Sequence, residues 1–112
     1  MRIAIPLFQG RLSAHFGHCQ QFALVDADDE TNSVRGTELL DAPPHQPGLL
    51  PAWLAEHGAR LIIAGGMGRR ALDLFAAQGI EVVTGAAQDT PEAIVAAYLE
   101  GRLESGGNIC DH

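Results

Sequence analysis

Apolar positions change their spacing near residue 41, and this change separates two groups of predicted elements. Before it, residues 2–7, 22–26 and 34–40 form apolar or alternating runs of the kind that strands prefer. Polar segments separate these runs, so we predict an antiparallel meander of three strands. The prolines between residues 43 and 47 then favour an extended path that a helix cannot follow.

After the prolines, apolar residues recur at helical spacing, and short apolar strands separate the resulting helices. The predicted helices cover residues 50–57, residues 67–75 and the segment from Thr90 to a stop at Gly101. A buried strand at 61–64 and another strand at 80–83 lie between them. Thr90 is typical of an N-cap, and Pro91 follows it where a missing N–H costs least.

The order of the predicted elements is βββαβαβα. Alternating βα units imply parallel strands joined by right-handed crossovers, and here they follow an antiparallel meander. We therefore predict an α/β fold with one mixed five-stranded sheet and helices on both faces. Residues 1–103 should form a single domain, and residues 104–112, which lack apolar periodicity, should form a flexible C-terminal tail.

The composition argues against several classes of partner. The chain has 112 residues and a formal net charge of −7, and its seven basic residues are all arginine. Such an acidic domain is poorly suited to nucleic acid. No apolar run reaches the length of a membrane span, and the N-terminal run lacks the apolar core of a signal peptide, so we expect a cytoplasmic protein. The distant cysteines Cys19 and Cys110 do not indicate a disulfide framework.

The segment 13–19 gathers residue types that bind metals. It holds a hydroxyl, two imidazoles and a thiol, from Ser13, His15, His18 and Cys19, around Phe16 and Gly17. Thiolate and imidazole ligands favour copper, iron or zinc over magnesium or calcium. Neutral imidazole can also donate an N–H to the sulfide of a bound cluster. From the spacing alone, a polar turn with Phe16 packed into the core is an equally good interpretation.

A second candidate is the glycine-rich turn Gly65-Gly66-Met67-Gly68, which lies between an apolar strand and an arginine-bearing helix. Glycines there allow backbone N–H groups to turn toward a ligand, and a helix N-terminus favours an anion. The turn matches half of a dinucleotide-binding fingerprint, but the strand after the helix ends without the acid that would hold a ribose. A tight turn that needs glycine only for packing explains the same residues equally well.

Further residues could complete a metal site. His45 lies among prolines, and Cys110 and His112 form a Cys-x-His pair after a glycine hinge, although a disordered tail is the simpler interpretation of that pair. Enzymatic patterns are sparse, because Ser13 lacks a nucleophile elbow and the carboxylates show no paired arrangement. A hydrolase that used Cys19 would need a depressed thiol pKa. We therefore predict no catalytic residues and a protein that is not an enzyme.

Together these motifs resemble the dinitrogenase iron–molybdenum cofactor biosynthesis family. The similarity covers nearly the whole chain, from MRIAIP and RLSAHFGHCQQFALVD to GARLIIAGGMGRRALDLFAAQGIEVVTGA and the closing NICDH. The Ser-x-His-Phe-Gly loop combined with the Gly-Gly-x-Gly turn is more specific than either motif alone. The segment PPHQPGLLPAWL resembles the subgroup that includes the orange protein of sulfate-reducing bacteria, a relative that holds a molybdenum–copper sulfide cluster non-covalently.

The resemblance implies a ribonuclease H-like fold, which agrees with the predicted βββαβαβα order. The clustered acidic residues of two-metal nucleases are absent from the sequence. The resemblance further implies that His15 contacts a bound cluster, with Ser13, Phe16 and Gly17 beside it and residues 65–68 in a second loop. The cofactor would be a metal–sulfur cluster, either molybdenum–copper sulfide or an iron–molybdenum cofactor precursor, held non-covalently.

We therefore predict a non-catalytic protein that binds and carries or stores such a cluster. Its partners would be the cluster and cluster-donor or acceptor proteins, with no nucleic acid and no membrane. The candidate metal ligands are His15, His18, Cys19, His45, Cys110 and His112. Binding through neutral imidazole should weaken below about pH 6. The alternative is a regulatory or interaction module that uses the same fold to bind a protein partner or a nucleotide.

Overall fold

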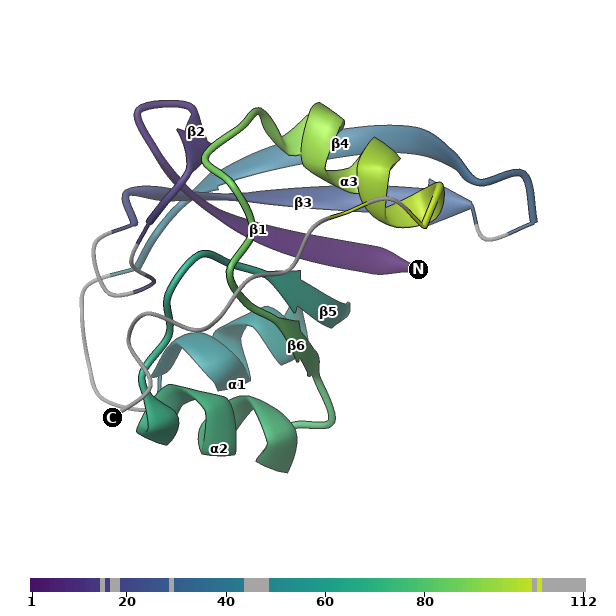
Figure 1. The fold of residues 1–112 in the computed structure, drawn as a ribbon. Coiled ribbons are helices and arrows are strands. Elements are labelled where there is room, and N and C mark those ends of the chain that lie inside the picture. Colours follow the sequence, from purple (N-terminus) through teal and green to yellow (C-terminus); the bar gives the residue numbers. More distant parts are fainter. Residues whose placement is uncertain (15, 17–18, 29, 44–48, 102, 104–112) are drawn as a thin grey trace.

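The computed structural model describes residues 1–14, 16, 19–28, 30–43, 49–101 and 103. The elements in these residues are β1 (Arg2–Phe8), β2 (Arg11–Leu12), β3 (Gln21–Asp28), β4 (Ser33–Asp41), α1 (Leu49–Glu56), β5 (Ala59–Ile63), α2 (Arg69–Ala77), β6 (Glu81–Val83) and α3 (Pro91–Leu99) (Figure 1). None of these helices has the length and apolar character that crossing a membrane requires.

The strands form one mixed sheet in the order β4-β3-β1-β5-β6, and β2 pairs with β1 outside this path. β3 is antiparallel to both β1 and β4, whereas β5 is parallel to both β1 and β6. The prediction of a mixed sheet that begins with an antiparallel meander and continues with parallel strands is confirmed.

Within the described residues the sheet has six strands rather than the predicted five. The additional strand, β2, lies in the segment that was predicted to be a loop, and it places Leu12 opposite Leu7 of β1. Gln9 and Gly10, which connect the two strands, have φ angles of 54° and 82°. Positive φ at both positions suits a two-residue hairpin, but Gln-Gly is a weaker hairpin signal than Asn-Gly or Asp-Gly. The sequence pattern therefore did not reveal this strand.

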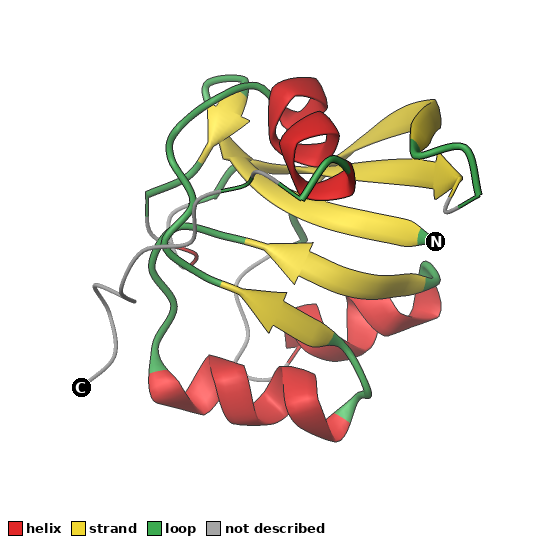
Figure 2. Ribbon diagram, turned by 45° about the vertical axis from the view of Figure 1, so that its right-hand side comes forward, coloured by secondary structure: helices red, strands yellow, loops and turns green. Residues whose placement is uncertain are grey.

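Helices cover both faces of the sheet, as predicted. α1 and α2 lie on one face and α3 lies on the other (Figures 1 and 2). In β1, Ile3 and Ile5 belong to the core cluster under α3, whereas Ala4 belongs to the cluster under α1 and α2. A strand that is buried on both faces is typical of the centre of an α/β sheet.

The helix ends follow the predicted signals with one exception. α1 ends before Gly58, which has a φ of 83°, and the hydroxyl of Thr90 caps α3. α2, however, begins at Arg69, so the prediction that Met67 starts this helix is wrong. Gly68 is the N-cap in extended conformation, and Met67 packs into the core before the helix begins.

Candidate functional site

Three segments that are distant in the sequence meet at one edge of the sheet. β1, β5 and β6 are parallel neighbours, so their carboxyl ends lie at the same edge (Figure 2). We call residues 13–19, after the β1–β2 hairpin, the first loop. Residues 64–68, after β5, are the second loop, and residues 84–89, after β6, are the third segment. The carboxyl edge of parallel strands is where open α/β sheets bind ligands.

Backbone hydrogen bonds join the first loop to the second. The N–H of Gly66 donates to the carbonyl of Ala14 at 2.6 Å, and the N–H of Phe16 donates to the carbonyl of Gly66 at 2.9 Å. The two residues that flank His15 in the sequence are therefore both bonded to Gly66. The fold thus brings together the two motifs that the sequence singled out.

Gly65 lets the two loops approach more closely than any other residue would. A Cβ atom at this position would lie 2.7 Å from the carbonyl oxygen of Ala14 and 2.8 Å from that of Ser13. Both partners are backbone atoms, so a side chain here would force the loops apart. At Gly68, in contrast, a Cβ would meet no atom within 4 Å. Glycine is therefore a steric requirement at position 65 and not at position 68.

The third segment is bonded to the second loop and to the end of β2, and the sequence pattern did not single it out. The N–H of Gly85 donates to the carbonyl of Gly65 at 2.7 Å, and the N–H of Ala86 donates to the carbonyl of Ala64 at 3.2 Å. Leu12, the last residue of β2 before the first loop, donates its N–H to the carbonyl of Asp89 at 2.9 Å. One signal in the sequence could have indicated this segment. A glycine follows each of two predicted parallel strands within two residues, Gly65 after the first and Gly85 after the second.

Phe16 and Met67 anchor the loops in the core. Phe16 is 9% exposed and Met67 is 1% exposed. The Phe16 ring contacts Phe75 edge to face with centroids 5.4 Å apart, and its centroid lies 6.2 Å from that of Phe22. Both side chains belong to the cluster under α1 and α2. Their burial leaves the loop backbones, rather than these side chains, to face a ligand.

Comparison with known proteins places the chain in a family. Residues 1–101 match the family described as Dinitrogenase iron-molybdenum cofactor. The chain belongs to this family. An uncharacterised protein of Methanocaldococcus jannaschii is 33% identical over 109 residues, which cover 93% of this chain and 90% of that protein.

Solved structures of relatives agree with this membership. The crystal structure of PH0822 matches with a TM-score of 0.86 at 33% identity, over 94% of each chain. The apo form of the orange protein from Desulfovibrio gigas matches with a TM-score of 0.71 at 25% identity, over 96% of this chain and 93% of that one. The resemblance to the family and to its orange protein subgroup is thereby confirmed.

In this family member, the amides of the second loop are not all directed at a ligand. The N–H of Gly66 donates to the carbonyl of Ala14. The expectation that the N–H groups of residues 65–68 all face an anion is therefore wrong for Gly66. The N-terminus of α2 remains a favourable place for negative charge, because Gly68 provides no side-chain cap. Arg69 and Arg70 follow it and are exposed.

Ser13 and Cys19 are the described polar residues of the first loop. Ser13 is 2% exposed, and its N–H donates to the carbonyl of Pro6 at 2.8 Å. Cys19 is half-buried, and burial raises the pKa of its thiol to about 11. The thiol is therefore protonated at neutral pH. A hydrolase that used Cys19 would need the opposite shift, so the raised pKa argues against this interpretation.

Several predicted site residues lie outside the described residues. These residues are His15, Gly17, His18, His45, Cys110 and His112. Within the part of the chain that the structure describes, no group of three or more His, Cys, Asp or Glu side chains could hold a metal ion.

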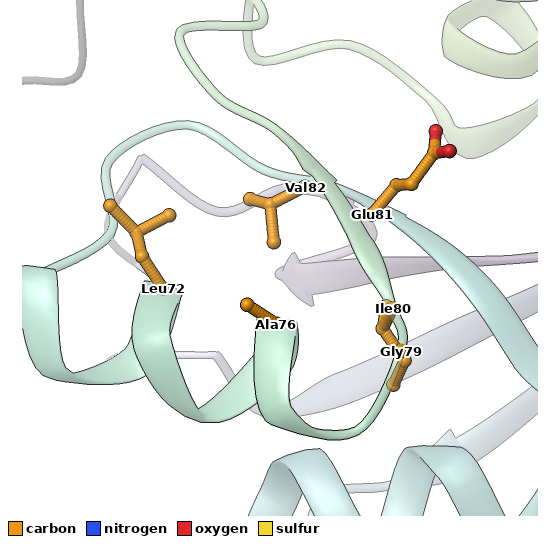
Figure 3. A pocket seen from close by; sticks show the side chains of 6 residues that line it. All are labelled: Leu72, Ala76, Gly79, Ile80, Glu81 and Val82. Carbon is orange, nitrogen blue, oxygen red and sulfur yellow. The ribbon is translucent and has the colours of Figure 1, made fainter.

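A groove of about 560 Å³ lies elsewhere on the molecule, between α2 and β6. Leu72, Ala76, Gly79, Ile80, Glu81 and Val82 line it (Figure 3). The side chains of Leu72, Ala76 and Val82 point toward one another across it, and that of Glu81 points away. None of the lining residues belongs to the first loop, the second loop or the third segment, so the groove is separate from the site.

Proposed function

We propose that the chain binds a metal–sulfur cluster as cargo at the edge where the first and second loops meet, and carries or stores it without catalytic turnover. The observation that carries the proposal is the pairing of Ala14 and Phe16 with Gly66, which joins the family's two characteristic motifs in one place. Membership of the dinitrogenase iron–molybdenum cofactor family supports a role in handling such cofactors.

The cargo would be a molybdenum–copper sulfide cluster or an iron–molybdenum cofactor precursor, held non-covalently. The uncapped N-terminus of α2 and the exposed guanidinium groups of Arg69 and Arg70 would stabilise an anionic thiometallate. His15 would contact the cluster as an N–H donor or as a ligand, because its two neighbours hold the loop against Gly66. His18, His45, Cys110 and His112 are the proposed additional contacts.

Cys19 is a weaker candidate ligand than the histidines. A thiol must lose its proton to bind a metal, and the raised pKa of this thiol makes that loss more costly at neutral pH. We therefore expect imidazole and backbone groups, rather than the Cys19 thiol, to make the main contacts with the cargo. This favours non-covalent binding over ligation by cysteine. We further propose that the carrier is cytoplasmic and exchanges its cargo with donor and acceptor proteins.

The direct test is metal analysis with a visible absorption spectrum of protein purified without oxygen, followed by titration with tetrathiomolybdate and copper(I). We expect a coloured complex, and we expect His15→Ala to weaken the affinity at least about tenfold, the loss of one charge-assisted contact. His57→Ala is the matched control, because His57 follows α1 at the opposite edge of the sheet. Its affinity should equal that of the wild type.

Two results would overturn the proposal. The first is a colourless, metal-free native protein that does not respond to thiomolybdate and copper. The second is unchanged affinity in both His15→Ala and a Gly65→Ala/Gly66→Ala double variant. Calorimetric titration with nucleotides tests the alternative of a regulatory nucleotide-binding module, and binding there without cluster binding would establish that alternative.

A further inference from the structure

Ala86 anchors the third segment in the core, whereas residues 87–89 are exposed. Ala86 is 7% exposed and belongs to the same core cluster as Leu12, the residue that leads into the first loop. The N–H of Leu12 donates to the carbonyl of Asp89 at 2.9 Å. The segment therefore holds the end of β2, from which the first loop begins, through a backbone hydrogen bond, and both segments contribute to the same core cluster.

The far end of the third segment is fixed by the start of α3. The Asp89 carboxylate accepts a hydrogen bond from the N–H of Thr90 at 2.8 Å. The Thr90 hydroxyl in turn accepts one from the N–H of Ala93 at 3.3 Å, and Pro91 occupies the first turn. Ile94 and Val95 of α3 are buried in the core. The third segment is thus fixed at one end by β6 and at the other by α3, whose N-terminus is capped and whose side chains are packed in the core.

Gly85 connects this segment to the second loop. Its φ of 78° lies in the left-handed region that side chains disfavour, and in this conformation its N–H reaches the carbonyl of Gly65 at 2.7 Å. Gly65 is also the residue at which a Cβ would lie within 2.8 Å of the carbonyl oxygens of Ser13 and Ala14. A continuous path of backbone contacts therefore runs from Gly85 through Gly65 to the residue that precedes His15.

We propose that residues 84–89 form a third part of the binding site, and that Gly85 is a positioning residue that sets the separation of the first and second loops. The inference rests on the proposed function. Gly85 itself need not touch the cargo, because it acts through Gly65. A displacement of the third segment would move Gly65 and, with it, the backbone on the N-terminal side of His15.

The test is Gly85→Ala, compared with Gly79→Ala. Gly79 has a nearly identical φ of 74° and open space around it, but it follows α2 at the opposite edge of the sheet. Both variants should therefore carry similar backbone strain. We expect Gly85→Ala to weaken the binding of tetrathiomolybdate with copper(I) about tenfold at equal loss of thermal stability, and Gly79→Ala to bind as the wild type does.

Backbone amide signals of Gly66 and Phe16 in nitrogen–proton NMR spectra provide a readout that needs no cargo. Gly85→Ala should shift both signals, and Gly79→Ala should leave them in place. Gly85→Asn is the conservative variant, because asparagine tolerates positive φ better than alanine, and it should restore both the signals and the affinity in large part. It also keeps the test decisive where Gly85→Ala does not fold.

The outcomes separate the two proposals. Amide signals and affinity in Gly85→Ala equal to those of Gly79→Ala would overturn the positioning role and leave the proposed function standing. Wild-type protein that takes up no thiomolybdate and copper would remove the proposed function, while the shift of the Gly66 and Phe16 signals would still decide whether Gly85 sets the separation of the loops.

Discussion

Three glycines near the site differ in what they require of the backbone. Gly65 must lack a side chain because carbonyl oxygens of the first loop lie too close for a Cβ, and Gly85 adopts a positive φ. Gly68 meets neither condition, since its φ of −70° suits any residue and the space around it is open. A glycine-rich motif therefore combines distinct demands, because Gly65 has no room for a side chain and Gly68 has.

The rate at which Cys19 is alkylated distinguishes a buried, protonated thiol from a reactive one. Burial raises its pKa to about 11, so at neutral pH the thiolate population should be lower by roughly two orders of magnitude than for an ordinary thiol. A more basic thiolate is also a stronger nucleophile, so the reaction rate falls less than the thiolate population does. We expect alkylation of Cys19 by iodoacetamide at neutral pH to be about tenfold slower than in the unfolded chain.

The measurement uses Cys110→Ser, which leaves Cys19 as the sole thiol of a chain with two cysteines. The same variant in guanidinium chloride supplies the unfolded rate. The rate in the folded protein should keep rising with pH beyond the value at which the unfolded rate levels off. Equal rates in the two states at neutral pH would contradict the burial of this thiol and reopen a nucleophilic role for it.

The start of α3 links helix stability to the geometry of the site. The Thr90 hydroxyl satisfies the N–H of Ala93, and the preceding residue, Asp89, holds Leu12 through its carbonyl. Thr90→Val keeps the shape of the side chain but removes the acceptor, so it should lower the free energy of unfolding by about 1 kcal/mol. For a domain of this size we expect a fall in melting temperature of about 3–5 °C.

Thr90→Ser is the control, because it retains the hydroxyl and should keep most of the stability. Thermal unfolding followed by circular dichroism measures both variants. A Thr90→Val protein as stable as the wild type would mean that the 3.3 Å contact contributes nothing to the helix start.

Local signals in the sequence predicted most of the elements. Alternation in residues 2–7 and the Thr90-Pro91 cap act over a few neighbouring residues, so β1 and α3 were expected where they lie. β2 and the third segment depend instead on backbone contacts between distant residues, such as Gly85 with Gly65, to which side chains contribute no pattern. The sequence thus indicated two loops of the site, and it could not indicate what holds them together.

The sheet topology explains how such distant residues converge. β4 and β6 form the two ends of the sheet, and β1 lies between its antiparallel half and its parallel half. Chain that leaves β1, β5 and β6 therefore emerges at one edge, whichever face its next helix covers. After β6 the chain passes to α3 on the face opposite α2, and the third segment spans this change of face (Figure 1).

The charge of the whole molecule opposes the anionic cargo that we propose. A net charge of −7 repels a thiometallate at long range, whereas Arg69 and Arg70 act only near the N-terminus of α2. Salt weakens interactions over distances beyond about 10 Å at 0.1 M. The association rate of tetrathiomolybdate, measured by stopped-flow absorbance, should therefore rise several-fold between low and physiological salt.

Glu30→Gln/Glu56→Gln tests the cause of this rise. Glu30 lies in the β3–β4 turn and Glu56 ends α1, so both are exposed at the edge opposite the site, and their replacement changes the net charge from −7 to −5. Association at low salt should become faster, and its dependence on salt should become shallower. A rate that instead falls as salt is added would mean that the arginines of α2 control the approach of the cargo. Screening slows association only when the charges that it screens attract the cargo.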